Sequence, residues 1–285
     1  MTPRDLWLRF ETYHDVTYFS PESRAVTDAL GCKGGWMGYF AQRAAPLGAV
    51  PPEIVAAAFY SFHPRMVSRA LPDAWDVASP ARFLDARLEG VDRALRRMLD
   101  GPDFGEAFAE AAELAGQAAE AAPLPGRVLA AANRALPVPD EPHLALWQAC
   151  TTLRESRGDG HIAALVAADL SPCETLVLFS ADKGLEPAYL RAARGWSEEE
   201  WRGAEATLAE RGLFDDGLTP AGRELREDVE RRTDEAATRP WEVLGEEGTA
   251  RFVDLMTPIA RRLGHANEAM RINPMGIDPV AQLPG

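Results

Sequence analysis

Residues 210–225 read ERGLFDDGLTPAGREL, and this stretch decides the fold of the second half of the chain. The turn Asp215-Asp216-Gly217 stands between the apolar pair Leu213-Phe214 and Leu218, a pattern that predicts a short hairpin. Thr219-Pro220 then places a hydroxyl at a helix cap and a proline at the first helical position. The stretch therefore predicts two short strands followed at once by a helix.

Three helices are predicted directly before this hairpin. Ser171 and Ser197 mark helix starts, because each serine has a glutamate three residues later, which is the pattern of a capping box. The predicted helices cover residues 171–180, 186–193 and 198–211. The last two are joined by a tight turn at Gly195-Trp196, which is the layout of a helix-turn-helix unit.

The run from Glu210 to Leu225 resembles the winged-helix regulators of the MarR type, because its turn, its cap and its apolar positions all agree with that pattern. The resemblance implies a MarR-like C-terminal domain that carries a small two-strand wing. The alternative interpretation of the same residues is a generic helical bundle with a polar turn. A shared fold does not by itself imply an activity.

Four further stretches carry a wider likeness: FETYHDVTYFSPE at residues 10–22, GYFAQRAAPLG at 38–48, RMVSRALPDAW at 65–75 and RESRGDGHIAAL at 154–165. Together with the winged-helix region they cover most of the chain. On these residues the chain resembles an actinobacterial helix-turn-helix family of the SalK/EvbL kind, which is often found near natural-product genes. The resemblance implies a regulatory or biosynthetic role in specialised metabolism and fixes no reaction.

The helix that would enter the DNA major groove is acidic. Its carboxylates are Glu198, Glu199, Glu200, Glu205 and Glu210, against the guanidiniums of Arg202 and Arg211. Helices that read the groove present Arg, Lys, Asn or Gln to the bases and cations to the phosphates. The net charge of −14 also repels a phosphate backbone. We therefore do not expect nucleic acid as a partner, although Arg191, Arg194 and Arg202 can form a small basic spot.

The composition of the chain narrows the classes of protein to which it can belong. Hydrophobic residues make up 46% of the chain, which is enough for a folded core. No run of 18 apolar residues is long enough for a membrane span, and the charged start MTPRDLWLRF does not resemble a secretion signal. The cysteines Cys32, Cys150 and Cys173 lie far apart, which argues against disulfides and a cysteine-rich zinc site. We expect a cytoplasmic protein.

Helical spacing of alanine and leucine dominates the chain, and strand-like alternation is almost absent, so we predict a mainly α fold. Residues 137–142, PVPDEP, are the best linker candidate. This divides the chain into an aromatic-rich helical N-terminal domain at residues 1–138 and a winged-helix-like C-terminal domain with trailing helices at 139–285.

Glycine and proline predict where the helices end. Residues 80–136 are expected to form three amphipathic helices, broken at Gly101-Pro102 and at residues 123–125. A further helical run from His143 to Ala168 is expected to be interrupted near Gly158 and Gly160.

The N-terminal segment is the candidate ligand pocket, because it combines many aromatic residues with Gly31, Gly34, Gly35 and Gly38. Pockets are mostly apolar, hold a few placed polar groups and favour domain boundaries. The residues expected to bind the ligand are Tyr13, His14, Tyr18, Trp36, Tyr39, Arg43, Arg157 and His161. The alternative is that these aromatic side chains are simply core.

The densest polar cluster inside an apolar run contains Arg154, Glu155, Arg157, Asp159 and His161. A histidine beside an aspartate can be held in one tautomer and act as a base or a hydrogen-bond donor. We therefore predict His161, Asp159 and His14 as candidate catalytic residues. The alternative for the cluster is a helix break with solvated charges, capped by Asp159.

His14 follows Glu11 by three residues, so the two side chains are expected on one side of a helix. A Glu-x-x-His pair is half of a di-iron site, but the sequence has no second pair, and we expect no metal centre. A haem held by His14 or His161 is the cofactor alternative. The simplest interpretation is a partly buried His14 bonded to Glu11 or to the backbone.

Two functions from different classes follow. The first is a small-molecule protein of specialised metabolism, a binding protein or an enzyme, with an apolar or aromatic metabolite at the boundary between the two halves. The second is a MarR-like transcriptional regulator that senses a ligand through its first half. A third interpretation is a non-catalytic partner of a biosynthetic complex, which exposed apolar patches would support.

Overall fold

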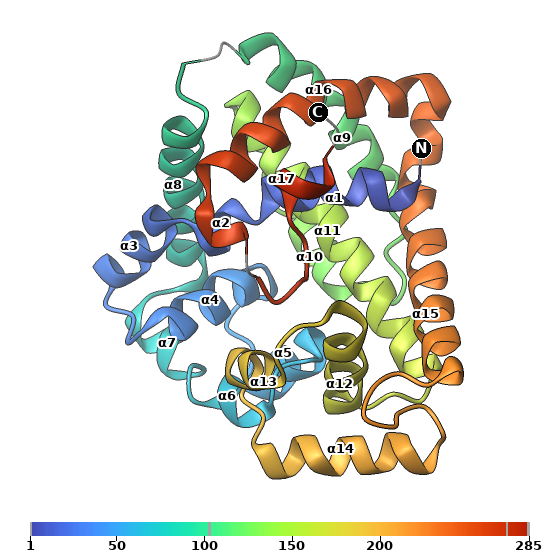
Figure 1. Ribbon diagram of the computed structural model, residues 1–285. Helices are drawn as coiled ribbons and strands as arrows, with labels where there is room; N and C mark the ends of the chain where they lie inside the picture. Colours follow the sequence, from blue (N-terminus) through green and yellow to red (C-terminus); the bar gives the residue numbers. More distant parts are fainter. Residues whose placement is uncertain (1, 102–103, 272, 284–285) are drawn as a thin grey trace.

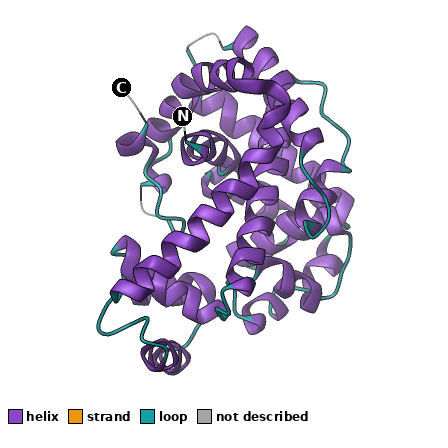
Figure 2. Cartoon of the chain, turned by 90° about the vertical axis from the view of Figure 1, so that its right-hand side faces the viewer, coloured by secondary structure: helices purple, strands orange, loops and turns teal. Residues whose placement is uncertain are grey.

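The computed structural model describes residues 2–101, 104–271 and 273–283. Within these ranges the chain forms helices joined by loops and no β-strand, so the predicted mainly α fold is confirmed (Figures 1 and 2). The first half contains α1 (Pro3–His14), α2 (Val16–Phe19), α3 (Pro21–Leu30), α4 (Gly35–Ala44), η1 (Ala45–Leu47), α5 (Pro52–Phe59), α6 (Pro64–Ser68), α7 (Asp73–Val77), α8 (Pro80–Met98), α9 (Gly105–Ala121) and α10 (Val128–Arg134).

The second half contains α11 (Pro142–Ala167), α12 (Pro172–Lys183), α13 (Pro187–Arg194), α14 (Glu198–Glu210), α15 (Pro220–Thr238), η2 (Arg239–Leu244), α16 (Gly245–Ala266), η3 (Glu268–Met270) and α17 (Pro279–Gln282). No single described helix is long and apolar enough to cross a membrane. Among the described helices, only α11 and α12 taken together reach that length and apolarity, and they are bent by 104° at the break between them.

Local capping chemistry places the helix starts where the sequence predicts them. Ser171 begins α12 and Ser197 begins α14, and both form complete capping boxes with the glutamate three residues later. Thr219 caps α15, with Pro220 at its first position. Helix α13 ends at Gly195, whose φ of 81° is a left-handed conformation that favours glycine. The predicted helix pair with a tight turn is therefore formed by α13 and α14.

The predicted breaks in residues 80–136 are confirmed, since α8, α9 and α10 are separate helices. Pro102, which marked the first break, lies outside the described residues. Residues 137–141 connect α10 to α11 on the surface, and Val138 is 71% exposed. The division of the chain into domains at residues 138 and 139 stays a prediction.

The predicted interruption near Gly158 and Gly160 is wrong, because α11 continues unbroken to Ala167. A Cβ atom at Gly160 would lie 3.4 Å from Nη2 of Arg127 and 3.5 Å from Cβ of Ala236. Glycine here therefore allows α15 to lie close to α11. Helix α11 runs through the centre of the molecule and contacts α1, α9, α10 and α15 (Figure 1).

Several core clusters surround α11. The first joins α1, α8, α9, α11 and α16 around Trp147, and the second joins α4–α7 around Phe40. The third joins the end of α11 to α12–α15 around Leu190 and Trp201. A small fourth cluster packs Met270, Ile277 and Leu283 against Leu8 of α1, so the C-terminal segment covers α1 (Figure 1).

The predicted two-strand wing is reduced to one antiparallel bridge between Phe214 and Leu218. The turn itself forms, because the amide of Asp215 donates to the carbonyl of Gly217 at 2.9 Å. Helix α14 ends at Glu210 and α15 begins at Pro220, so each arm of the hairpin is too short for a strand. The described chain has a tight turn where the sequence predicted a wing.

Replacing Gly222 by alanine should distort this turn and lower the stability of the protein. Its Cβ would lie 2.1 Å from the carbonyl oxygen of Leu213, so the hairpin must shift, and we expect Gly222→Ala to lower stability by about 2 kcal/mol or more. Gly203 of α14 is the control, because no atom lies within 4 Å of a Cβ there. Gly203→Ala should raise stability by about 1 kcal/mol. Urea unfolding of both variants checks this, and equal midpoints would contradict it.

Candidate ligand site

A cavity of about 830 Å³ lies where the N-terminal helices meet α11, α12, α13 and α15. Its volume is within the range of small-molecule sites. Aromatic side chains form much of the wall: Trp7, Tyr18, Phe19, Trp36, Tyr39, Phe59, Tyr60, Phe62, Phe179 and Tyr189. Arginines supply most of its charge: Arg4, Arg24, Arg43, Arg154, Arg157, Arg194 and Arg226.

Most of the residues predicted to bind a ligand line this cavity. They are Tyr18, Trp36, Tyr39, Arg43, Arg157 and His161. Tyr13 and His14 do not line it, because they lie in the core beside it with no exposed surface. The hydroxyl of Tyr13 donates to the carbonyl of His143 at 3.0 Å and so ties α1 to α11.

His14 is buried between the rings of Trp147 and Tyr18, with ring centroids at 6.2 Å and 5.1 Å. The hydroxyl of Thr151 donates to the carbonyl of Trp147 at 2.8 Å, so it accepts from Nδ1 of His14 at 2.9 Å. Burial, followed by the charge of Arg154, holds the pKa of His14 well below its usual range. The predicted bond between His14 and Glu11 is not formed, because Glu11 accepts instead from Trp7 and Arg154.

The predicted pair of Asp159 and His161 is not formed either. Oδ2 of Asp159 accepts the amides of Leu129 and Ala130, both at 3.0 Å, and so caps the start of α10. His161 lies at the cavity wall, with Nδ1 2.9 Å from Oγ1 of Thr233. Residues two apart on an unbroken helix do not face each other. Burial lowers the pKa of His161 to about 4, so its ring is neutral at neutral pH.

A chain of buried ion pairs borders the cavity. Arg43 donates from Nε and Nη2 to the two carboxylate oxygens of Glu155, at 2.8 Å and 2.9 Å. Arg154 donates to Glu155 and to Glu11, both at 3.1 Å. Burial opposes ionisation of Glu155, but Arg43 and then Arg154 outweigh it and hold the pKa of Glu155 far below its usual range. These pairs join α1, α4 and α11.

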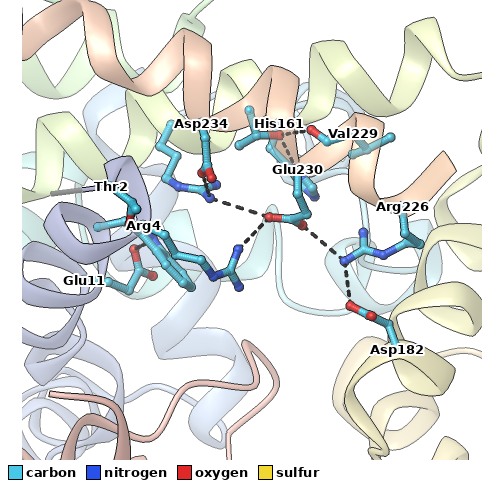
Figure 3. A network of polar contacts seen from close by, with 12 residues as sticks. Thr2, Arg4, Glu11, His161, Asp182, Arg226, Val229, Glu230 and Asp234 are labelled. Carbon is cyan, nitrogen blue, oxygen red and sulfur yellow. Dashed lines mark hydrogen bonds and ion pairs between the residues drawn. The ribbon is translucent and has the colours of Figure 1, made fainter. Parts of the chain in front are cut away.

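A second polar network surrounds Glu230 of α15 (Figure 3). Its carboxylate accepts from Arg4 at 2.8 Å and from Arg226 at 3.1 Å, and Arg226 also reaches Asp182 at 3.4 Å. Burial raises the pKa of Glu230, but His161, Arg226 and the other neighbouring bases outweigh burial and bring it to about 2. This network joins α1, α12 and α15.

Asp15 is a buried carboxyl group without a partner. Neither of its oxygens has a hydrogen bond within the described part of the chain, and Oγ1 of Thr17 and Nε2 of Gln42 also lack partners. All three residues border the cavity. Burial, and then the charge of Glu11, raise the pKa of Asp15 well above its usual range. Burial therefore disfavours the charged form of the Asp15 side chain in the folded protein.

The predicted basic spot on the helix pair is not present. Arg202 pairs with Glu198, and Arg191 lies 3.8 Å from the same carboxylate. Arg194 lines the cavity. On α14 the side chains of Glu198, Glu199 and Glu210 are exposed, as are Asp215 and Asp216 at the turn. The outer surface of this helix and turn is therefore acidic.

The sequence did not identify Arg226, Glu230 or Phe179 as cavity residues. The signal was weak, because these residues come from helices far apart in the chain and only their packing brings them together. Within residues 2–101, 104–271 and 273–283, no group of three or more His, Cys, Asp or Glu side chains could hold a metal ion. Of the two histidines considered for haem, only His161 faces the cavity, and a haem stays an untested alternative.

The raised pKa of Asp15 predicts a pH dependence. Folding raises its pKa, so its contribution to stability is complete below about pH 4 and is lost as the pH rises toward the folded pKa, by about 1.4 kcal/mol per unit. Asp15→Asn keeps the shape without the titration. We expect the melting temperature of Asp15→Asn, relative to that of the wild type, to rise between about pH 5 and about pH 7.

The control for this measurement is Asp140→Asn, at an exposed surface position. Its melting temperature should follow that of the wild type at every pH. Parallel curves for wild type and Asp15→Asn across this pH range would show that Asp15 is not held neutral in the folded protein.

Comparison with known proteins gives one match. The family model described as "Helix-turn-helix family" matches residues 3–270, which is nearly the whole chain. No curated protein and no solved structure matches the chain. The match includes the helix pair α13–α14 and also all the helices that surround the cavity.

Proposed function

The chain belongs to this helix-turn-helix family, and we propose that it uses the scaffold to bind a small apolar or aromatic metabolite at the boundary between its two halves. The observation that carries the proposal is the cavity of about 830 Å³, whose wall combines aromatic rings with a set of polar side chains, most of them held in ion pairs. Sites of this kind occur where two bodies of a protein meet.

The state of the polar side chains favours binding over proton-transfer chemistry. A histidine with a pKa of about 4 is a weak base, and His161 has no carboxylate from Asp159 beside it. His14 is sealed in the core away from the cavity. We therefore propose a binding protein first. If the protein is an enzyme, His161 is the predicted catalytic residue with access to the ligand.

The finer family assignments belong to the same proposal. A MarR-like arrangement of α12–α15 is supported by the capped helix pair and by the hairpin turn at Asp215 to Gly217. A SalK/EvbL type and a role in specialised metabolism rest on the resemblance of the sequence. Loss of DNA binding is supported by the exposed carboxylates on α14 and at the turn.

A neutral aromatic dye tests the proposed site. N-phenyl-1-naphthylamine gains fluorescence in apolar cavities, and we expect the wild type to bind it at one site. Ile162 of α11 lines the cavity, so Ile162→Trp should fill part of it and weaken dye binding about tenfold or more. Binding is measured by fluorescence titration, after circular dichroism has shown that the variant is folded.

Val166→Trp is the matched control, because Val166 lies one turn along the same helix, is 60% exposed and does not line the cavity. It should bind the dye as the wild type does. Absence of dye binding to the wild type, or equal binding by both tryptophan variants, would rule out the cavity as the site.

The second candidate function is a MarR-like transcriptional regulator. Membership of a helix-turn-helix family and the tight turn between α13 and α14 favour it. The acidic surface of α14 argues against it, because phosphate contacts need cations.

A gel-shift with DNA from upstream of the protein's own gene decides between the two. We expect no retardation at about 50 mM salt, where phosphate contacts are strongest. Retardation that weakens as salt is added would make gene regulation the leading function.

A further inference from the structure

We propose that the ligand carries an acidic group, such as a carboxylate, sulfonate or phosphate, and that Arg194 is the residue that binds it. This inference rests on the proposed ligand-binding function and names the chemical class of the ligand. It goes beyond an apolar or aromatic metabolite, because it requires one negative charge at a defined place in the cavity wall.

Arg194 is the last residue of α13, and its guanidinium lies over the ring of Phe62, 4.5 Å from the centroid. Nη1 donates to the carbonyl of Ala193 at 3.2 Å, and Nε is buried without a partner in the described ranges. A guanidinium has five N–H donors in a fixed plane. Arg194 therefore lines the cavity with a guanidinium that keeps donors without a partner among the described residues.

Other cavity arginines are already neutralised by carboxylates. Arg43 and Arg154 bind Glu155, and Arg24 binds Asp28. Arg4 and Arg226 bind Glu230, and Arg157 binds Asp234. Among the cavity arginines, only Arg194 has no ion pair with any residue that the structure describes. Arg194 thus differs from the other arginines of the cavity, each of which forms an ion pair with a carboxylate.

The surroundings of Arg194 leave its charge uncompensated. Arg43 and Arg154 are close enough to repel it, and the carboxylates of that cluster, Glu155 and Glu11, are occupied by these two arginines. Burial, and then the charge of Glu11, raise the pKa of Asp15 well above its usual range, which disfavours a third negative charge here. The ion pairs of this cluster thus join two guanidiniums to two carboxylates, and Arg194 is left without a carboxylate partner among the described residues.

Arg194 remains a cation at neutral pH. Burial, and then repulsion from Arg43, lower the pKa of Arg194 to about 10, which is still well above neutral. A buried charge without a partner is costly, and an anion with good geometry relieves that cost through charge-assisted hydrogen bonds. The neighbouring rings of Phe62 and Tyr39 would receive the apolar part of the same ligand.

Two dyes with one skeleton test the inference. 8-Anilinonaphthalene-1-sulfonate carries a sulfonate, and N-phenyl-1-naphthylamine is the same aromatic skeleton without it. We expect Arg194→Gln to weaken binding of the sulfonate dye about tenfold or more, and to change binding of the neutral dye less than about twofold. Arg194→Lys, which keeps the charge, should recover part of the lost affinity.

Arg191→Gln is the matched control, because Arg191 lies on the same helix and does not line the cavity. It should leave both dyes unaffected, and Ile162→Trp should block both. Equal binding of the sulfonate dye by wild type and Arg194→Gln would overturn the inference but leave the binding site intact. Loss of both dyes in Arg194→Gln would also overturn it, because the side chain would then only shape the cavity. Failure of the wild type to bind either dye would remove the proposed function itself.

Discussion

Glu155, near the middle of α11, is the carboxylate on which the arrangement around the cavity depends. It is 1% exposed, and it holds Arg43 of α4 and Arg154 of its own helix, while Arg154 also holds Glu11 of α1. Buried ion pairs tolerate little change, because removing one member leaves the other charged and without water. The pairs therefore fix how α1 and α4 lie on α11, and with them the position of the cavity.

The molecule divides its charges between outside and inside. The chain is acidic as a whole, and the carboxylates of α14 and its turn face solvent. Guanidiniums gather around the cavity, and one of them, Arg194, comes from the helix directly before α14. In a helix-turn-helix protein that contacts phosphate, cations are needed on the outer face of this unit. Here the basic residue of α13 that has no carboxylate partner in the described structure faces inward.

The sequence predicted features that neighbouring residues determine. Ser171, Ser197 and Thr219 begin helices because each hydroxyl bonds an amide three residues later, and that chemistry is local. It did not predict features that depend on packing. Gly160 suggested a break, but its missing side chain instead admits α15. Asp159 and His161 suggested a pair, but the continuous helix turns them apart, toward α10 and toward the cavity. Tyr18, Trp36 and Tyr39 were expected to bind a ligand and do line the cavity, whereas Glu230 and Arg226 come from α15, which no sequence pattern placed there.

Hydrogen bonds tie the turn before α14 to the loop after α5. The amide of His63 donates to the carbonyl of Arg194 at 2.8 Å, and Nε1 of Trp196 donates to the carbonyl of Ser61 at 2.9 Å. Between them, a Cβ atom at Gly195 would lie 2.9 Å from Cβ of Met66, which leaves no room for a side chain. The turn that precedes α14 is therefore held in place and does not act as a hinge. Any rotation of α14 must break these bonds or move α5 and α6 with it. The pair α13–α14 therefore cannot move independently of the N-terminal helices.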